Sequence, residues 1–326
     1  MYNIQENKAI KVDAVTFSEL KMLENDIEEL LRCNIDMVCD EEESMLIVGR
    51  QVRNTHYGRS DLTAVDNNGN IVLIEIKRDR KDIESRKEAF EFQAIRYAAS
   101  YATIEDPEDL VNKIYAPYIE KYRTEFENES LTSTELGNRK LTEFLHVNGA
   151  EANFNKNQKV ILVASEFDEQ TLSAVAWLNS NGVNISCYKL IPYKINGDVY
   201  INVEKLLPLN NYNDYYVDFL EKNITLKKTG KKLSRRNLPK IDAMIEWGVV
   251  KAGDTILAKD RNEEAMLLKN GNVLVNDVEL SMQKWLKELY GWSSIQTYVF
   301  AIHKDSGKSL SKIREEYMNA IMENSE

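Results

Sequence analysis

Two acidic residues and a lysine stand at a spacing that could hold a divalent cation. Two strand-like runs, residues 61–65 and 71–77, flank the polar turn DNNGN. A three-residue loop that ends with Gly69 in the left-handed conformation is a favoured closure of a hairpin. Counting outward from this loop places Asp61 directly opposite Glu75, where Cβ atoms are roughly 5 Å apart. The two carboxylates are therefore expected to share one face of the hairpin.

Lys77 joins this pair because side chains alternate along a strand, so that Glu75 and Lys77 lie on the same face. Residues 71–76 are almost continuously apolar, which is typical of a strand covered on both faces. Charges in such a place need partners, and a divalent cation together with a phosphate would supply them. A structural ion pair on an exposed sheet is the alternative, and a slip of one residue at the turn would separate the carboxylates.

These residues resemble the motif of the PD-(D/E)xK phosphodiesterase superfamily, the fold of many restriction and repair nucleases. Ser60 departs from the motif name, which has proline there. The resemblance covers about residues 17–208, and residues 155–190 are more loosely similar to a bacterial and archaeal branch that includes single-strand and mismatch-directed DNA nucleases. The matching residues are Asp61, the tripeptide Glu75-Ile76-Lys77, and Gln93 to Tyr97, which resemble the QxxxY helix of the superfamily.

The resemblance implies a Mg²⁺-dependent endodeoxyribonuclease, with Mn²⁺ as a substitute ion. Asp61, Glu75 and the carbonyl of Ile76 would bind the metal, which suits magnesium because this ion takes a few carboxylates and keeps several waters. Lys77 would orient the attacking water or stabilise the developing charge. Gln93 would hold that lysine or the water.

A helix before the hairpin is expected to add one more carboxylate. The sequence TFSE at residues 16–19 forms a capping box, and the leucines and isoleucine of residues 20–31 recur at helical spacing. Glu28 lies at the rim of this apolar stripe near Glu24, whereas Glu29 points away. The resemblance therefore implies that Glu28 faces the active site, with Glu24 as the fallback. A solvated helix face is the alternative for Glu28.

Basic residues in two places are candidates for contact with DNA phosphates. Arg53, His56 and Arg59 precede Asp61 in a donor-rich loop, and phosphate contacts position a duplex without reading its sequence. The alternative for His56 is a plain loop histidine. A second, acid-free basic stretch could release counterions from a nucleic-acid backbone, or could be a solvated linker. Its candidates are Lys231, Lys232, Arg235 and Arg236.

The length of 326 residues favours two domains. The expected class is α/β: a restriction-endonuclease-like mixed sheet flanked by helices, followed by a small α+β domain. A buried strand, an amphipathic helix and another strand over residues 159–193 indicate a right-handed crossover. The expected ranges are residues 1–226 for the nuclease-like domain, with a helical insertion at about 103–157, then 227–240 for the basic linker and 241–326 for the C-terminal domain.

The C-terminal segment resembles a RAMA domain, a module that accompanies restriction or DNA-modification enzymes. The resemblance implies a sensor of modified DNA. A small α+β domain whose tryptophans only fill its core is the alternative. The matching features are Gly253-Asp254, Asn270-Gly271, Gly291-Trp292 and the closing sequence GKSLSKIREEY.

Composition limits these expectations. With 43% hydrophobic and 29% charged residues the chain is that of an ordinary globular protein. No apolar run approaches the roughly 20 residues of a membrane span, and the first residues lack a signal-peptide core, so a cytoplasmic protein without membrane contact is expected. Three cysteines without a CxxC pair and three scattered histidines suggest neither a disulfide frame nor a zinc site.

The net charge of −11 is the main observation against a DNA-binding enzyme, since nucleic-acid-binding surfaces are basic. A local basic patch and a bound metal would overcome it. The competing function is a non-catalytic nucleic-acid-binding protein or a reader of modified DNA. If the chain is a nuclease, one active site per chain would need a homodimer, or two successive nicks, to break both strands.

Overall fold

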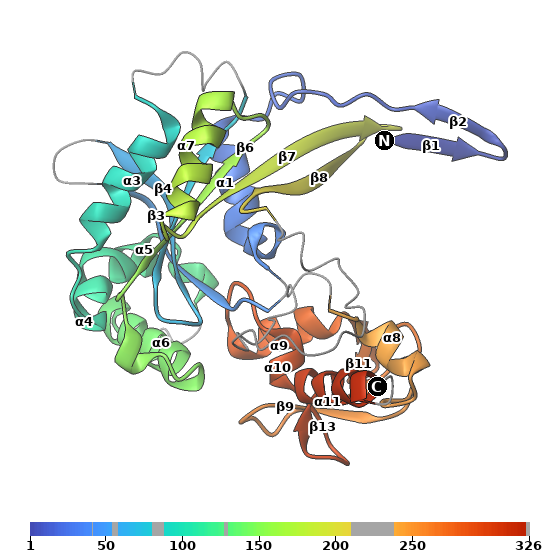
Figure 1. The fold of residues 1–326 in the computed structure, drawn as a ribbon. Helices are drawn as coiled ribbons and strands as arrows, with labels where there is room; N and C mark the ends of the chain where they lie inside the picture. The colour runs from blue at the N-terminus through green and yellow to red at the C-terminus, as the bar shows by residue number, and fades with distance from the viewer. Residues whose placement is uncertain (41, 54–57, 80–87, 127–129, 210–237, 324–326) are drawn as a thin grey trace, which may run out of the picture. The chain divides into compact units, whose positions relative to one another are not determined.

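A computed structural model describes residues 1–40, 42–53, 58–79, 88–126, 130–209 and 238–323 (Figure 1). The chain divides into two compact units, the first comprising residues 1–38 and 45–209 and the second comprising residues 39–44 and 210–326. The predicted linker and its boundaries lie largely outside the described residues.

The first unit is built on a six-stranded mixed sheet, in agreement with the predicted α/β class. The strand order is β3-β4-β5-β6-β7-β8, in which β5, β6 and β7 run parallel and the remaining neighbours pair antiparallel. Residues 71–76 are all buried, as expected for a central strand covered on both faces. The strands are β3 (Met45–Arg53), β4 (Arg59–Asp66), β5 (Ile71–Lys77), β6 (Gln158–Ala164), β7 (Ile185–Ile195) and β8 (Asp198–Leu207).

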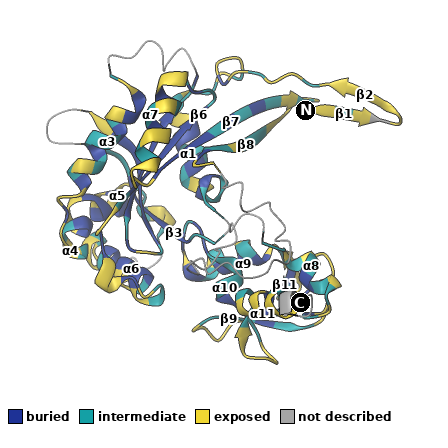
Figure 2. Cartoon of the chain, viewed as in Figure 1, coloured by how far each residue is buried: buried dark blue, intermediate teal, exposed yellow. Residues whose placement is uncertain are grey.

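Helices flank this sheet. α3 (Phe90–Tyr101) and α7 (Glu169–Ser180) pack against each other and over the parallel strands, and α1 (Glu24–Cys33) packs on β4 and β5. The predicted insertion is helical: α4 (Pro107–Leu110), the π-helical turn η2 (Val111–Tyr115), α5 (Ala116–Lys121) and α6 (Ser133–Val147). The remaining short turns are η1 (Ile35–Val38), η3 (Arg123–Glu125) and η4 (Glu151–Asn153). A separate hairpin of β1 (Tyr2–Gln5) and β2 (Lys8–Lys11) is exposed (Figure 2).

The helix that carries Glu28 begins later than predicted. The capping box forms, since the Thr16 amide donates to the Glu19 carboxylate and the Glu19 amide donates to the Thr16 hydroxyl. Only a turn follows, because Lys21 adopts a left-handed conformation with φ +59° that a continuous helix does not allow. α1 instead begins at Glu24, where the Leu23 amide donates to the Asp26 carboxylate.

The second unit is α+β. Its antiparallel sheet has the order β12-β11-β10-β9-β13-β14. Trp285 and Trp292 are buried in its core, and Trp292 packs edge-on against Phe300. The strands are β9 (Thr255–Ala258), β10 (Glu264–Leu267), β11 (Val273–Val275), β12 (Val278–Leu280), β13 (Ala301–His303) and β14 (Lys308–Ser309). The helices are α8 (Ile241–Glu246), α9 (Met282–Tyr290), α10 (Thr297–Phe300) and α11 (Leu310–Glu323).

A short segment from the N-terminal half of the sequence belongs to this second unit. The Ser294 hydroxyl donates to the carbonyl of Glu43 over 2.9 Å, and the amide of Gln296 donates to the Ser44 hydroxyl over 3.0 Å. Arg314 forms an ion pair with Glu42. Within the described part of the chain, none of the helices combines the length and the apolar character needed to cross a bilayer.

Candidate active site

The hairpin of β4 and β5 brings Asp61 and Glu75 together as predicted. Leu62 pairs with Ile74, so the same register continued by one residue places Asp61 opposite Glu75. Gly69 closes the loop with φ +83°, the left-handed conformation that the three-residue loop requires. Both carboxylates are buried, with residue exposures of 5% for Asp61 and 0% for Glu75.

Asp61 is held by the backbone of the neighbouring strand. Its Oδ2 accepts from the amide of Ile76 over 2.7 Å, and its Oδ1 accepts from Gln51 Nε2 over 3.3 Å. Burial raises the pKa of Asp61 to about 7, although the nearby Lys77 ammonium and the Ile76 amide both act to lower it. A bound cation would favour the ionised form of this carboxylate.

Glu75 has one satisfied and one unsatisfied carboxylate oxygen. Gln93 donates its side-chain amide to Oε1, whereas Oε2 has no hydrogen-bond partner among the described residues. Burial, followed by the proximity of Asp61, raises the pKa of Glu75 well above its usual range. A buried, unsatisfied carboxylate oxygen is costly unless a ligand completes it.

Lys77 completes the predicted trio. Its Nζ donates to Glu24 Oε1 over 3.2 Å and to the Ile76 carbonyl over 2.9 Å, and lies 4.0 Å from Glu75 Oε1. Burial by itself lowers the pKa of Lys77, but the carboxylates, with Asp61 contributing most, raise it above the ordinary value. The ammonium is therefore charged at neutral pH.

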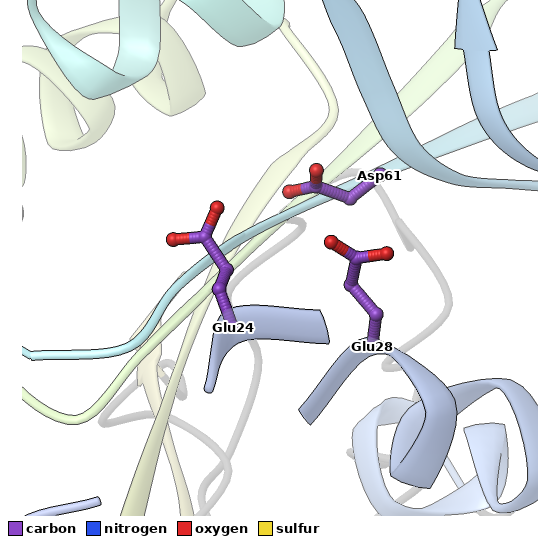
Figure 3. A group of neighbouring side chains, drawn as sticks. All are labelled: Glu24, Glu28 and Asp61. Carbon is purple, nitrogen blue, oxygen red and sulfur yellow. The ribbon is translucent and has the colours of Figure 1, made fainter. Parts of the chain in front are cut away.

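Two carboxylates of α1 point toward Asp61 (Figure 3). One carboxylate oxygen from each of Glu24, Glu28 and Asp61 lies within 4.8 Å of the others. Glu28 is 3% exposed, so it is not on a solvated helix face. Its Oε1 accepts from Gln51 over 2.7 Å and its Oε2 accepts from Arg50 over 3.3 Å. Glu24, the fallback of the sequence analysis, joins Glu28 in this group.

The donor set fits a hard divalent cation. Oxygen ligands from a few carboxylates match the preference of magnesium. Glu75 is not one of the three grouped carboxylates, but its unsatisfied Oε2 is a buried acceptor that an ion between Asp61 and Glu75 would complete. The carbonyl of Ile76, a predicted ligand, accepts from Lys77 in this structure. Use of that carbonyl as a ligand therefore requires the Lys77 ammonium to release it.

No family model matches the chain, and no curated protein matches it either. The functional interpretation therefore depends on the geometry of the site and on the motif resemblance.

Two of the predicted phosphate-binding residues lie within the described chain. Arg53 ends β3 and Arg59 begins β4, both are exposed, and they are directly paired across the two strands. His56 lies outside the described residues, and so do Lys231, Lys232, Arg235 and Arg236.

Gln93 and Tyr97, the two residues that resemble the QxxxY motif, make different contacts. Gln93 reaches Glu75, whereas Tyr97 is buried and packs close to Gly58, whose φ is +85°. Ser60, at the proline position of the motif name, is buried and shares a hydrogen bond of 2.6 Å with the Tyr101 hydroxyl. Ser60 supports the hairpin, whereas Tyr97 also lies near the carboxylates, since burial and then the nearby Glu75 raise the pKa of its hydroxyl.

Sequence reasoning did not single out Gln51 or Arg50. Both lie on β3, and both contact Glu28. No motif marks them, because their position depends on how β3 pairs with β4. The sequence does not specify this pairing, with its irregularity between Ile47 and Gly49, so it offered no signal for them.

Proposed function

We propose that the chain is a Mg²⁺-dependent endodeoxyribonuclease of the PD-(D/E)xK type, with the restriction-endonuclease-like fold in its first unit. The observation that carries the proposal is the meeting of Asp61, Glu75 and Lys77 at one buried place, with a carboxylate oxygen of Glu75 that lacks a partner among the described residues. A purely structural ion pair does not explain why three further carboxyl or amide side chains from α1 and α3 converge there.

Each residue of the site would have its own role in phosphodiester hydrolysis. Asp61 and Glu75 would hold the ion, with the Ile76 carbonyl as a third ligand. Magnesium bound there would polarise the scissile phosphate and acidify a bound water. Lys77, which is charged and mostly buried, would orient that water or stabilise the charge that develops on the phosphate. Gln93 was expected to hold Lys77 or the water, but in this structure it donates to Glu75, and it would keep that carboxylate in place.

The paired arginines support a polyanionic substrate. Like charges directly opposite each other on neighbouring strands destabilise a sheet, yet Arg53 and Arg59 occupy such a pair beside Ser60 and Asp61. A DNA phosphate bound between the two arginines would offset their repulsion. Arg59 is two residues from Asp61, a candidate metal ligand. The net charge of −11 is compatible with this proposal, because the arginines provide a local positive patch.

For the second unit, the RAMA resemblance supports a role in sensing modified DNA. Cleavage of matched unmodified, adenine-methylated and cytosine-modified plasmids, each with Mg²⁺, Mn²⁺ or EDTA, tests both roles. Metal-dependent cutting that varies with modification is the expected result. Cutting that ignores modification would remove the sensor, and tight DNA binding without any cutting would favour a non-catalytic reader.

A further inference from the structure

Gln51 bridges two of the carboxylates in the site. Its Nε2 donates to Glu28 Oε1 over 2.7 Å and to Asp61 Oδ1 over 3.3 Å. Ionised carboxylates only accept hydrogen bonds, so the amide nitrogen of Gln51, and not its oxygen, must face them. Gln51 is thus a single neutral donor that connects a helix carboxylate to a hairpin carboxylate.

An irregularity in β3 places the Gln51 side chain opposite Asp61. Ile47 pairs with Ala64 but Gly49 pairs with Thr63, so one extra residue is inserted in β3 at this point. Beyond it, Arg50 pairs with Leu62, which puts Gln51 opposite Asp61. In an uninterrupted ladder Arg50 would stand opposite Asp61 instead. Bulges of this kind often redirect a side chain beside an active site.

The backbone of Gln51 is also unusual. Its φ is +53°, in the left-handed region that a residue with a Cβ atom disfavours. Glutamine lacks the short side chain with which asparagine or aspartate compensates locally, and glycine would adopt this conformation with less strain. Strained residues of this kind cluster at functional sites, where the surrounding structure enforces them.

A neutral amide suits this place chemically. It draws Glu28 and Asp61 together without cancelling their charge, and each ionised carboxylate keeps further lone pairs for a metal ion. Arg50, by contrast, forms ion pairs with the other oxygen of Glu28 and with the carboxylate of Glu29. An arginine opposite Asp61 would place a permanent positive charge where the cation is expected.

We propose that Gln51 is a positioning residue, which holds Glu28 and Asp61 at the spacing that one divalent cation needs. This inference rests on the proposed metal-dependent function. It adds a residue from β3 to a site otherwise formed by α1, β4, β5 and α3. Removing a residue that orients a metal ligand through a hydrogen bond typically lowers metal affinity ten- to hundredfold.

The test is Mn²⁺ binding to the full-length protein, measured by calorimetry, together with thermal unfolding in EDTA. Gln51→Gly is the informative variant, since it relieves the left-handed strain and removes the amide. Its melting temperature is expected to stay close to that of the wild type, because the relief of strain offsets the loss of the two hydrogen bonds, while its Mn²⁺ affinity falls about tenfold or more. Asn196→Gly is the matched control, because Asn196 also has φ +53° but lies in the turn between β7 and β8.

The outcomes separate the two proposals. Wild-type affinity in Gln51→Gly, with normal binding by the wild type, would overturn the role of Gln51 alone. No binding by the wild type would overturn both the metal-dependent function and this inference. If Gln51→Gly does not fold, Gln51→Asn decides, since asparagine tolerates the left-handed conformation but is one methylene shorter. It is expected to bind Mn²⁺ more weakly than the wild type, and unchanged binding would refute the proposal.

Discussion

Replacing Asp61 by asparagine should make the metal-free protein increasingly stable relative to the wild type as the pH rises. Asp61 is buried with a pKa of about 7, whereas an aspartate in an unfolded chain has a pKa of about 3.9. Ionisation of Asp61 therefore costs the folded protein roughly 4 kcal/mol. The attraction of Lys77 and the hydrogen bond from Ile76 are already contained in that pKa. Asparagine has nearly the same shape and does not ionise.

The direction of the pKa change decides whether the wild type gains or loses stability as the pH rises. Because folding raises the pKa of Asp61, the wild type loses stability as the pH rises from about 4 to about 7, and the full loss persists above that range. Most of this loss falls between pH 5 and pH 8. The stability advantage of Asp61→Asn should therefore grow by roughly 3 kcal/mol between these two pH values.

Urea unfolding in EDTA, at pH 5 and at pH 8, measures this difference directly. Any effect of the substitution that does not depend on pH cancels in the comparison. Titrating groups that do not interact with Asp61 cancel as well. Glu75 does not cancel, because the Asp61 carboxylate raises its pKa in the wild type, and loss of that effect also favours the variant at high pH. A stability difference between variant and wild type that stays constant, or that shrinks toward pH 8, would refute the assignment of Asp61 as a buried carboxylate whose ionisation destabilises the metal-free protein.

Three further predictions concern the surroundings of the site. Arg53→Ala combined with Arg59→Ala should weaken DNA binding for all sequences alike and reduce the salt slope of binding by about 2, as measured by fluorescence anisotropy; an unchanged slope would exclude phosphate contact. Gly58→Ala should destabilise the protein by about 2 kcal/mol in urea unfolding, because φ is +85° and the added Cβ would meet the Tyr97 hydroxyl; unaltered stability would contradict this packing. Gln93→Ala should weaken Mn²⁺ binding tenfold or more in calorimetry, because Glu75 loses its donor; wild-type affinity would show that Gln93 does not position Glu75.

Local features of the sequence predicted the hairpin well. The turn residues set the register of β4 and β5, and the alternation of side chains along β5 then placed Glu75 and Lys77 on one face. A local pattern also placed Glu28 at the rim of the apolar stripe of α1, but only the family resemblance implied that it faces the site. For such features a few neighbouring residues contain the necessary information.

Features that depend on distant pairing could not be predicted in this way. The position of Gln51 depends on the irregularity where β3 pairs with β4, which no residue of β3 signals by itself. The start of α1 was wrong for a related reason: the predicted capping box forms, but the left-handed turn at Lys21 ends the helical geometry after it. Tertiary packing decides both, and it overrides the local preference.

Metal-dependent DNA cleavage by the wild type, compared with the same measurement on Asp61→Asn and Lys77→Ala, tests the central claim most directly. Supercoiled plasmid is incubated with Mg²⁺, Mn²⁺ or EDTA, and circular dichroism verifies that each variant is folded. The wild type is expected to cut only with metal, and both folded variants are expected to lose cleavage. Full activity in either folded variant, or cleavage by the wild type in EDTA, would contradict the proposed active site.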